Sequence, residues 1–317
     1  MTTKKPVIAV VGATGAQGSG LVRAILEDPQ RRFTARAITR KPGEERARAL
    51  AAKGAEVVAA DLNDLASLER AFAGATGAFC ITNFWEHYSP DTEVAQARNM
   101  ARAAASSDVR HVIWSTLEDT RKLVPLSDSR MPTLHGRYKV PHFDGKGEAD
   151  AVFAEEKAPA TLLRTSFYWD NLIHFGIGPK KDASGQLVFT LPMGDRKLPG
   201  IAAEDIGPCA YGIFLRGGEM VGRTVGIAGE HLSGAQMASE LSAALGQPVK
   251  YQSLPFEAFR KLGFPGAEDL GNMFQYKHDF EREFCSARSV EATRALYPGL
   301  QTFRQWLARH GKEIPLG

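Results

Sequence analysis

Cysteine is scarce in this chain, with three among 317 residues. Cys80, Cys209 and Cys285 are odd in number and far apart, so a disulfide framework of the kind found in small secreted domains is excluded. This usage fits a protein kept in a reducing compartment, and we expect a cytoplasmic location.

Long apolar runs are also missing. No run approaches the roughly 20 residues that a membrane-spanning helix needs, so we expect no membrane association. Residues 1–5 are a short polar lead-in with no long apolar region behind them. We therefore expect no signal peptide.

The chain also lacks an excess of charge of one sign. The 39 lysines and arginines nearly balance the 36 aspartates and glutamates, and the net charge is +3. The basic residues are scattered along the chain, which argues against a dedicated nucleic-acid-binding domain. We expect no direct nucleic-acid partner, and no metal site is predicted. Hydrophobic residues make up 44% and charged residues 24%, as in an ordinary globular protein.

A glycine-rich turn near the N-terminus is the most informative feature that is present. Residues 7–11 (VIAVV) read as a parallel strand covered on both faces, and a helix is expected after the turn. Gly12 permits the tight turn, Gly15 lets a pyrophosphate approach the backbone, and Gly18 lets the helix pack close to the strand. The helix would offer its free N–H groups and positive dipole end to that pyrophosphate. A glycine triplet can also be a simple turn, but its place after an apolar strand favours a dinucleotide site.

Apolar strands alternate with amphipathic helices over the first half of the chain. This alternation predicts βαβ units and an α/β fold with a doubly wound parallel sheet of the Rossmann type. We expect a nucleotide-binding domain over residues 1–166 and a smaller mixed α/β lobe over 167–317, with some segments returning to the sheet. The expected strands are 7–11, 33–39, 56–60, 77–82, 111–115 and 160–165, and the expected helices are those after residue 18 and at 44–52, 65–72, 92–106 and 142–157.

The regular pattern lapses between residues 116 and 141. Four proline or glycine residues punctuate this segment, which is long for a structureless loop in a compact domain. Such loops are usually functional lids or disordered segments. Beyond it, the expected strands are 187–191, 224–227 and 249–254, and the expected helices are 233–245, 256–262 and a last one that carries Phe303, Trp306 and Leu307.

The end of the second expected strand distinguishes between the two nicotinamide cofactors. A site for NAD places a carboxylate there for the ribose 2′-hydroxyl, whereas the 2′-phosphate of NADP needs a cation. Here the residues are Thr39, Arg40 and Lys41, with no acidic residue before Glu44. The planar guanidinium of Arg40 can bind a phosphate through two hydrogen bonds. These residues could also be solvated charges after a strand, but with the glycine turn upstream they favour NADP(H).

Two further strand ends carry polar residues that could contact the cofactor. Asp61 follows the third strand, where its carboxylate could accept a hydrogen bond from the adenine amino group. Thr82, Asn83 and Phe84 follow the fourth, beside the expected riboses and pyrophosphate. Asp, Thr and Asn are equally common as helix caps and turn residues, so both interpretations stay open.

The usual proton-transfer pair of short-chain dehydrogenases is absent. These enzymes use Tyr-x-x-x-Lys on the helix after the fifth strand, where both side chains share one face. No tyrosine here has a lysine four residues later, and His142-Phe-Asp-Gly-Lys146 stands in the expected place. Lys146 could hold the nicotinamide ribose, and His142 could donate a proton or could be a packed or capping histidine. Ser115, at the end of the fifth strand, could orient a substrate or be a turn residue.

Several motifs together resemble the NmrA-like family of atypical short-chain dehydrogenases, and within it the HSCARG-type NADP(H) sensors. The resemblance implies a Rossmann domain with a small α/β lobe, a preference for NADP(H), and a role in sensing the redox state, often by binding regulatory proteins. The motifs are GATGAQG at 12–18, Thr39-Arg40, TNFWE at 82–86, HFDGKGE at 142–148, YWDN at 168–171 and LGFPGA at 262–267.

The turn, the strand ends and the resemblance together give one set of candidate cofactor contacts. Lys146, His142 and Ser115 are candidate catalytic residues if the protein is an enzyme. The candidate contacts are Gly12, Ala13, Thr14, Gly15, Ala16, Gln17, Gly18, Arg40, Lys41, Asp61, Leu62, Thr82, Asn83, Phe84, Lys146, Phe167, Tyr168, Trp169 and Asp170.

Two functions compete at this point. The first is an NADP(H) sensor with a regulatory role and little or no turnover, which presents a surface to a regulatory protein. The second is an NADPH-dependent reductase of a carbonyl, quinone or activated alkene, with aromatic residues lining a pocket for a small apolar substrate. A scaffold stabilised by its cofactor is a third possibility. In each case the expected assembly is a monomer or a homodimer.

Overall fold

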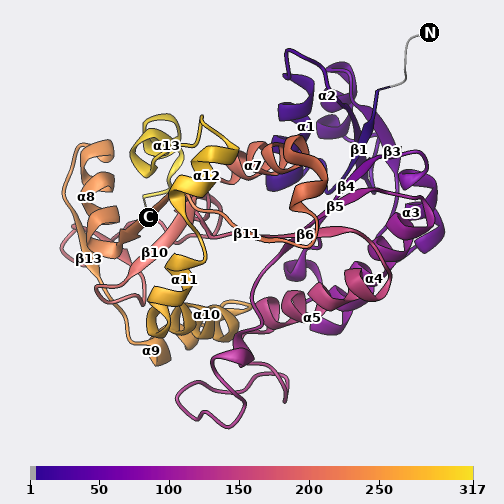
Figure 1. Cartoon of the computed structure of the whole chain (residues 1–317). Coiled ribbons are helices and arrows are strands. Elements are labelled where there is room, and N and C mark those ends of the chain that lie inside the picture. The colour runs from indigo at the N-terminus through magenta and orange to yellow at the C-terminus, as the bar shows by residue number, and fades with distance from the viewer. Residues whose placement is uncertain (1–4, 317) are drawn as a thin grey trace. The chain divides into compact units, whose positions relative to one another are not determined.

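The computed structural model describes residues 5–316, which form two compact units (Figure 1). Each unit combines segments that are distant in the sequence. The first unit consists of residues up to 119, 142–165 and 204–225, and the second of 120–141, 166–203 and 226 onward.

The first unit is built on a seven-stranded sheet with the order β11-β6-β5-β4-β1-β2-β3. Neighbouring strands from β6 to β3 run parallel; Val10 at the centre pairs with Ala37 of β2 and Phe79 of β4. This confirms the doubly wound sheet. The strands are β1 (Val7–Val11), β2 (Thr34–Thr39), β3 (Glu56–Ala59), β4 (Gly77–Cys80), β5 (His111–Thr116), β6 (Ala160–Arg164) and β11 (Thr224–Gly226).

Helices cover both faces of this sheet (Figure 1). Alternate residues of β1 point to opposite faces, and Val7, Ala9 and Val11 pack in one cluster with apolar residues of α3, α4 and α5. On the other face Phe214 of α7 lies against Gly77 of β4. The helices of this unit are α1 (Ala16–Leu26), α2 (Glu45–Ala52), α3 (Leu65–Phe72), α4 (Pro90–Ser106), α5 (Pro141–Glu155) and most of α7 (Ala203–Arg216).

The segment 204–225 returns to the sheet of the first unit. Its strand β11 lies at the sheet edge beside β6. The helix α7 that precedes it was not predicted, because Gly207 and Pro208 interrupt its pattern. Gly207 packs directly on Gly20 of α1, so the two glycines allow the helix backbones to touch.

The second unit contains two three-stranded sheets, with the orders β12-β10-β7 and β13-β9-β8. Its core includes Trp169, Phe303 and Trp306, whose rings lie within 6.4 Å of one another. The strands are β7 (Phe167–Tyr168), β8 (Lys180–Lys181), β9 (Leu187–Thr190), β10 (Lys197–Ile201), β12 (Glu230–Ser233) and β13 (Val249–Gln252). The helices are α6 (Asn171–His174), α8 (Gly234–Leu245), α9 (Phe256–Arg260), α10 (Ala267–Asp279), α11 (Glu281–Ser286), α12 (Val290–Leu296) and α13 (Phe303–His310).

The irregular segment between residues 120 and 141 belongs to the second unit and is held in place there. The buried ammonium of Lys139 donates to the carbonyls of Asp128 and Met131, at 2.8 and 2.7 Å. Asn272 of α10 donates to the carbonyls of Pro132 and Lys139. Buried polar groups therefore anchor the backbone of this segment to the second unit.

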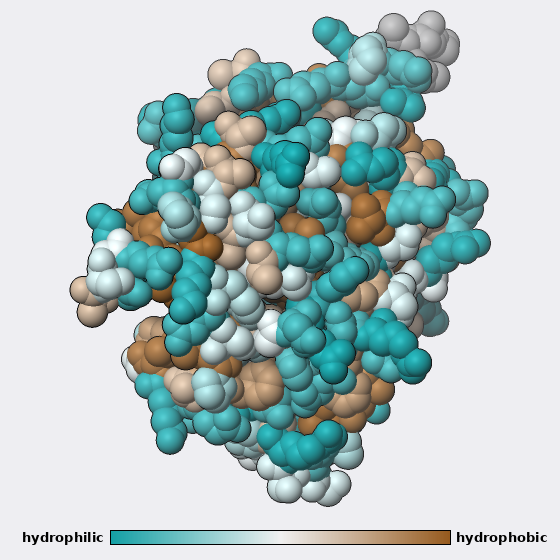
Figure 2. Space-filling model, turned by 90° about the vertical axis from the view of Figure 1, so that its left-hand side faces the viewer, coloured by the Kyte–Doolittle hydropathy of each residue, from teal (hydrophilic) through white to brown (hydrophobic). Residues whose placement is uncertain are grey.

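Within residues 5–316, no helix is long and apolar enough to cross a membrane. On the face shown in Figure 2, hydrophilic residues dominate and hydrophobic residues form separate groups. All three cysteines are free thiols, and burial raises the pKa of Cys285 to about 11.

Candidate functional site

The glycine-rich turn connects β1 to α1 as predicted. Gly12 has φ +64°, in the left-handed region that suits glycine. A β-carbon on Gly18 would lie 2.4 Å from the carbonyl oxygen of Gly12 and 2.8 Å from its carbonyl carbon. Gly18 is therefore required where the helix passes against the turn, which is the role predicted from its spacing.

The N-terminus of α1 is open to an anion. Its N-cap, Gly15, supplies no side chain, and no acidic residue lies in its first turn. By contrast Asp64 caps α3 and Ser89 caps α4 with their side chains. The Gly15 N–H donates to the Gly12 carbonyl at 2.9 Å, whereas the exposed Ala16 offers an N–H group that a pyrophosphate can accept from.

Gln17 and Ser115 bind each other, which changes how each is interpreted. The Ser115 hydroxyl donates to Gln17 Oε1 at 2.8 Å, and both side chains are buried. This bond ties the start of α1 to the end of β5. The structure thus gives Ser115 a positioning role, and its other candidate role, orienting a substrate, stays a prediction.

The two cations after β2 are both paired with carboxylates. Arg40 Nη2 lies 2.8 Å from Glu86 Oε1, and Lys41 Nζ lies 2.9 Å from Glu44 Oε1. Glu86 ends the short 3-10 helix Phe84–Glu86 after β4, and it also accepts from Asn83 Nδ2 at 3.2 Å. The sequence did not reveal Glu86 as a neighbour of Arg40, because 45 residues separate them.

Asp61 and Leu62 form the turn after β3. Asp61 Oδ1 accepts from the backbone and the side-chain amide of Asn63, at 2.8 and 3.0 Å. The Leu62 carbonyl accepts from Asn99 of α4, and its side chain packs on the core. The turn is thus well anchored. Both of these hydrogen bonds of the Asp61 carboxylate use Oδ1, and the contact of this carboxylate with the adenine stays a prediction.

Lys146 is fixed by three groups, one from α4, one from the end of β4 and one from β5. Its ammonium lies 3.0 Å from Glu93 Oε1 and 2.6 Å from Thr82 Oγ1. It also lies over the indole ring of Trp114, 4.9 Å from the centroid. Thr82 in turn donates to Glu93 Oε1 at 2.8 Å. Lys146 therefore reaches the strand end that was predicted to border the cofactor riboses.

Glu93 is completely buried in the first turn of α4. Burial by itself would raise the pKa of this carboxyl, but Lys146, His87 and Thr82 outweigh burial and lower it to about 2. The positive N-terminal end of α4 favours the same ionised form. Glu93 is thus a buried anion whose charge holds Lys146.

His87 faces the second oxygen of Glu93. Its Nδ1 accepts from the backbone N–H of Ser89 at 3.1 Å, so in the neutral ring the proton is on Nε2. Nε2 lies 3.5 Å from Glu93 Oε2. The carboxylate is therefore bordered by donors on both oxygens, although the His87 contact is long.

His142 lies one turn before Lys146 on α5 and is packed among aromatic rings. Its ring centroid is 4.9 Å from that of Trp85, 5.9 Å from Phe84 and 4.8 Å from Phe143. Its exposed fraction is 6%. The His142 ring is thus packed among aromatic neighbours, and its candidate role as a proton donor stays a prediction.

Residues 167–170 lie in the second unit. Phe167 and Tyr168 form β7, and Asp170 Oδ2 accepts from the backbone N–H of Ala203 at the start of α7. Trp169 is buried against Gly200 and the ring of Phe303. The Trp169 ring is therefore part of the core of its own unit.

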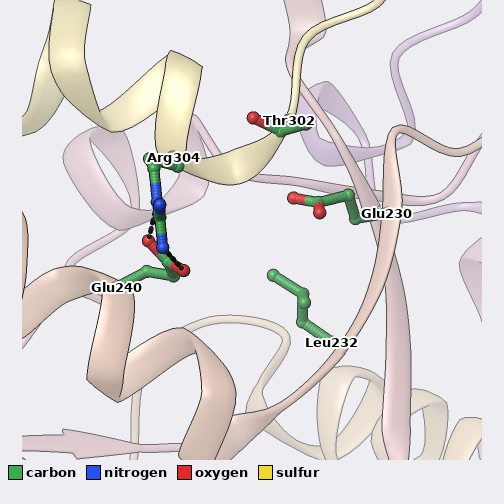
Figure 3. Close-up of a pocket in the computed structure, with 5 residues that line it drawn as sticks. All are labelled: Glu230, Leu232, Glu240, Thr302 and Arg304. Atoms are coloured by element: carbon green, nitrogen blue, oxygen red, sulfur yellow. Dashed lines mark hydrogen bonds and ion pairs between the residues drawn. The ribbon is translucent and has the colours of Figure 1, made fainter.

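A cavity of about 250 Å³ lies in the second unit (Figure 3). On one side, Arg304 donates two hydrogen bonds to the carboxylate of Glu240 in a bidentate pair. Glu230 accepts a hydrogen bond from the backbone N–H of Phe303. None of its lining residues was predicted as a site residue. The lining residues are Glu230, Leu232, Glu240, Thr302 and Arg304. Within residues 5–316, no group of His, Cys, Asp and Glu is placed to hold a metal ion.

The known proteins that this chain resembles include three of similar length. The oxidoreductase FrzB of Cladobotryum sp, described as containing an NmrA-like family domain, is 28% identical over 91% of this chain and 89% of its own. An NAD(P)H azoreductase of Xenophilus azovorans is 29% identical over 81% and 82%. The crystal structure of NmrA, a negative transcriptional regulator, in complex with NADP superimposes with a TM-score of 0.77 at 23% identity, covering 96% and 95%.

The structural match confirms the Rossmann-type fold with a smaller mixed lobe. The family model that matches is that of the NmrA-like family, and it spans residues 4–307. The finer HSCARG-type assignment stays a prediction. From its turn, its sheet and this match over nearly its whole length, the chain belongs to the NmrA-like family.

Proposed function

We propose that this protein binds NADP(H) along the carboxyl edge of its parallel sheet and acts as a sensor of that cofactor. One observation carries the proposal: a well-formed nucleotide edge stands beside an incomplete proton relay. His142 replaces the usual tyrosine and is packed among aromatic rings. Lys146, which could hold a ribose, is fixed by Glu93.

The residues of the first unit fit the parts of the cofactor. The open N-terminus of α1 would accept the pyrophosphate, and Arg40 would bind the 2′-phosphate. Lys146, held at the end of β4, would donate to the nicotinamide ribose hydroxyls. The bound cofactor supplies hydride chemistry, and the chain supplies binding and orientation.

Replacement of Arg40 by alanine tests the cofactor choice. Loss of a charge-assisted contact to phosphate should weaken NADPH binding about tenfold or more, while NADH binding stays about the same. Isothermal titration with both cofactors measures this, and Arg46→Ala on the exposed face of α2 is the matched control. Unchanged preference in Arg40→Ala, or NADH binding tighter than NADPH in the unaltered protein, would contradict the choice of cofactor.

The sensor role requires different affinities or structures with the two redox forms, because a ligand shifts a switch only through differential affinity. We expect hydrogen exchange within residues 83–88 or 116–141 to differ between the NADP⁺ and NADPH complexes. Equal affinities together with identical exchange would rule the sensor out.

A reductase is the second candidate, and the fixed ammonium of Lys146 favours it. Relatives described as an oxidoreductase and as an NAD(P)H azoreductase support this class. NADPH oxidation is measured with carbonyl, quinone, activated-alkene and azo acceptors. The sensor proposal expects rates at background for all acceptors. Turnover that falls at least about tenfold in Lys146→Met, with NADPH affinity reduced far less, would establish the reductase instead.

A further inference from the structure

Arg40, the cation on which the preference for NADP(H) depends, forms an ion pair with Glu86. Arg40 Nη2 and Glu86 Oε1 are 2.8 Å apart, and Asn83 Nδ2 donates to the same carboxylate oxygen at 3.2 Å. Glu86 is therefore held from two sides at the end of the 3-10 helix Phe84–Glu86. The Glu86 carboxylate thus already engages Nη2 of the guanidinium that would bind the phosphate.

This pair can be displaced. The side chain of Arg40 is 56% exposed and that of Glu86 46% exposed, so water screens their attraction. The pair between Glu93 and Lys146 differs, since its carboxylate is fully buried. A 2′-phosphate carries more charge than a carboxylate and presents more acceptor oxygens to the guanidinium. It would also repel a carboxylate that stayed in place.

We propose that Glu86 is a specificity-determining residue: it competes with the 2′-phosphate for Arg40 and lowers the affinity for NADP(H) selectively. The inference rests on the proposed binding of NADP(H) and deepens it. NADH lacks the phosphate, so it leaves the pair between Arg40 and Glu86 in place. Binding of NADP(H) releases Glu86.

If Glu86 is released, the change can be transmitted to the aromatic residues that pack around His142. Glu86 is covalently next to Trp85, whose ring is 4.9 Å from His142 and 5.4 Å from Phe84. Phe84, Trp85 and Glu86 all belong to the same short 3-10 helix, and His142 packs on this helix from α5. The cofactor phosphate would thus be coupled, through Arg40 and Glu86, to the segment that packs on His142, one helical turn before Lys146.

The test compares Glu86→Gln with the unaltered protein. We expect NADPH and the fragment 2′,5′-ADP to bind about two- to five-fold more tightly, and NADH and 5′-AMP to bind as before. Glu27→Gln removes the same charge at the C-cap of α1, at the other end of that helix from the glycine turn. This control should change none of the affinities.

Each other result overturns the inference. If Glu86→Gln raised the affinities for NADPH and NADH equally, or if Glu27→Gln raised the NADPH affinity as much as Glu86→Gln does, the net charge of the protein alone would explain the effect. Weaker NADH binding in Glu86→Gln would mean that Glu86 accepts from a ribose hydroxyl instead. A crystal structure with 2′,5′-ADP in which Glu86 stays on Arg40 would also refute it. If the unaltered protein binds no NADPH at all, the proposed function itself fails; if NADPH binds through Arg40 but Glu86→Gln changes nothing, only this inference fails.

Discussion

Replacing Glu93 by glutamine is expected to lower the free energy of unfolding by about 3 kcal/mol at pH 7. The carboxylate is completely buried and holds Lys146 at 3.0 Å. Its pKa is lowered from 4.5 to about 2 in the folded protein, which corresponds to about 3 kcal/mol of stabilisation of the charged form. Glutamine keeps the shape but loses that charge, so the partly buried ammonium of Lys146 loses its anion.

The effect has a defined pH dependence. A carboxyl whose folded pKa is depressed stabilises the protein above the unfolded pKa and loses that contribution as pH falls through the folded value. The difference between the unaltered protein and Glu93→Gln should therefore be full above about pH 5 and should shrink toward pH 2. Urea unfolding at a series of pH values measures it.

Glu155→Gln is the matched control for this prediction. Glu155 is 55% exposed and pairs with Arg98, so its loss should cost at most about 1 kcal/mol. If the free energy of unfolding of Glu93→Gln lay within about 1 kcal/mol of that of the unaltered protein and had the same pH dependence, the buried pair would not stabilise the fold.

Replacing Gly18 by alanine is expected to lower the free energy of unfolding by about 2 kcal/mol or more and NADPH affinity about tenfold or more. The new β-carbon would lie 2.4 Å from the Gly12 carbonyl oxygen and 3.0 Å from the α-carbon of Ala13. These are backbone atoms, so α1 must move away from the turn. This movement would displace the N–H groups of α1 that we propose bind the pyrophosphate. Thermal unfolding and titration with NADPH measure the two effects.

Gly218→Ala is the control, because a β-carbon there meets nothing within 4 Å and its φ is not positive. This change should leave the stability unaltered or raise it slightly by restricting the unfolded chain. Gly18→Ala with unaltered stability and NADPH affinity would contradict the close packing of the turn.

The local sequence pattern was sufficient for the first half of the fold. Each of β1 to β6 lies within about two residues of its expected range, since apolar strands between amphipathic helices are self-evident in the sequence. Beyond residue 166 the prediction missed the strands β7, β8, β10 and β12 and the helices α6, α7 and α10 to α12. Glycine and proline interrupt the pattern of α7, and its stability comes from packing on α1. No local signal reports that packing.

The candidate site divides in a similar way. Spacing alone indicated the turn, Arg40 and Lys146, because each follows a strand or lies on a helix at a fixed position. Glu86 and Glu93 were missed as partners, since a glutamate in the first turn of a helix is common and has no special signature. The pairing depends on β2 and α5 meeting the segment after β4 in space.

The sequence by itself determined the class of the protein: a parallel sheet, a glycine turn built for a dinucleotide, and a lysine without its usual tyrosine. These features are local, and each follows from the spacing of a few residues. Only the tertiary structure decided that His142 is packed among rings, that Glu93 is a buried anion under Lys146, and that Glu86 holds Arg40. Burial and ion pairing join residues distant in the chain, and their energies depend on surroundings that no local pattern contains.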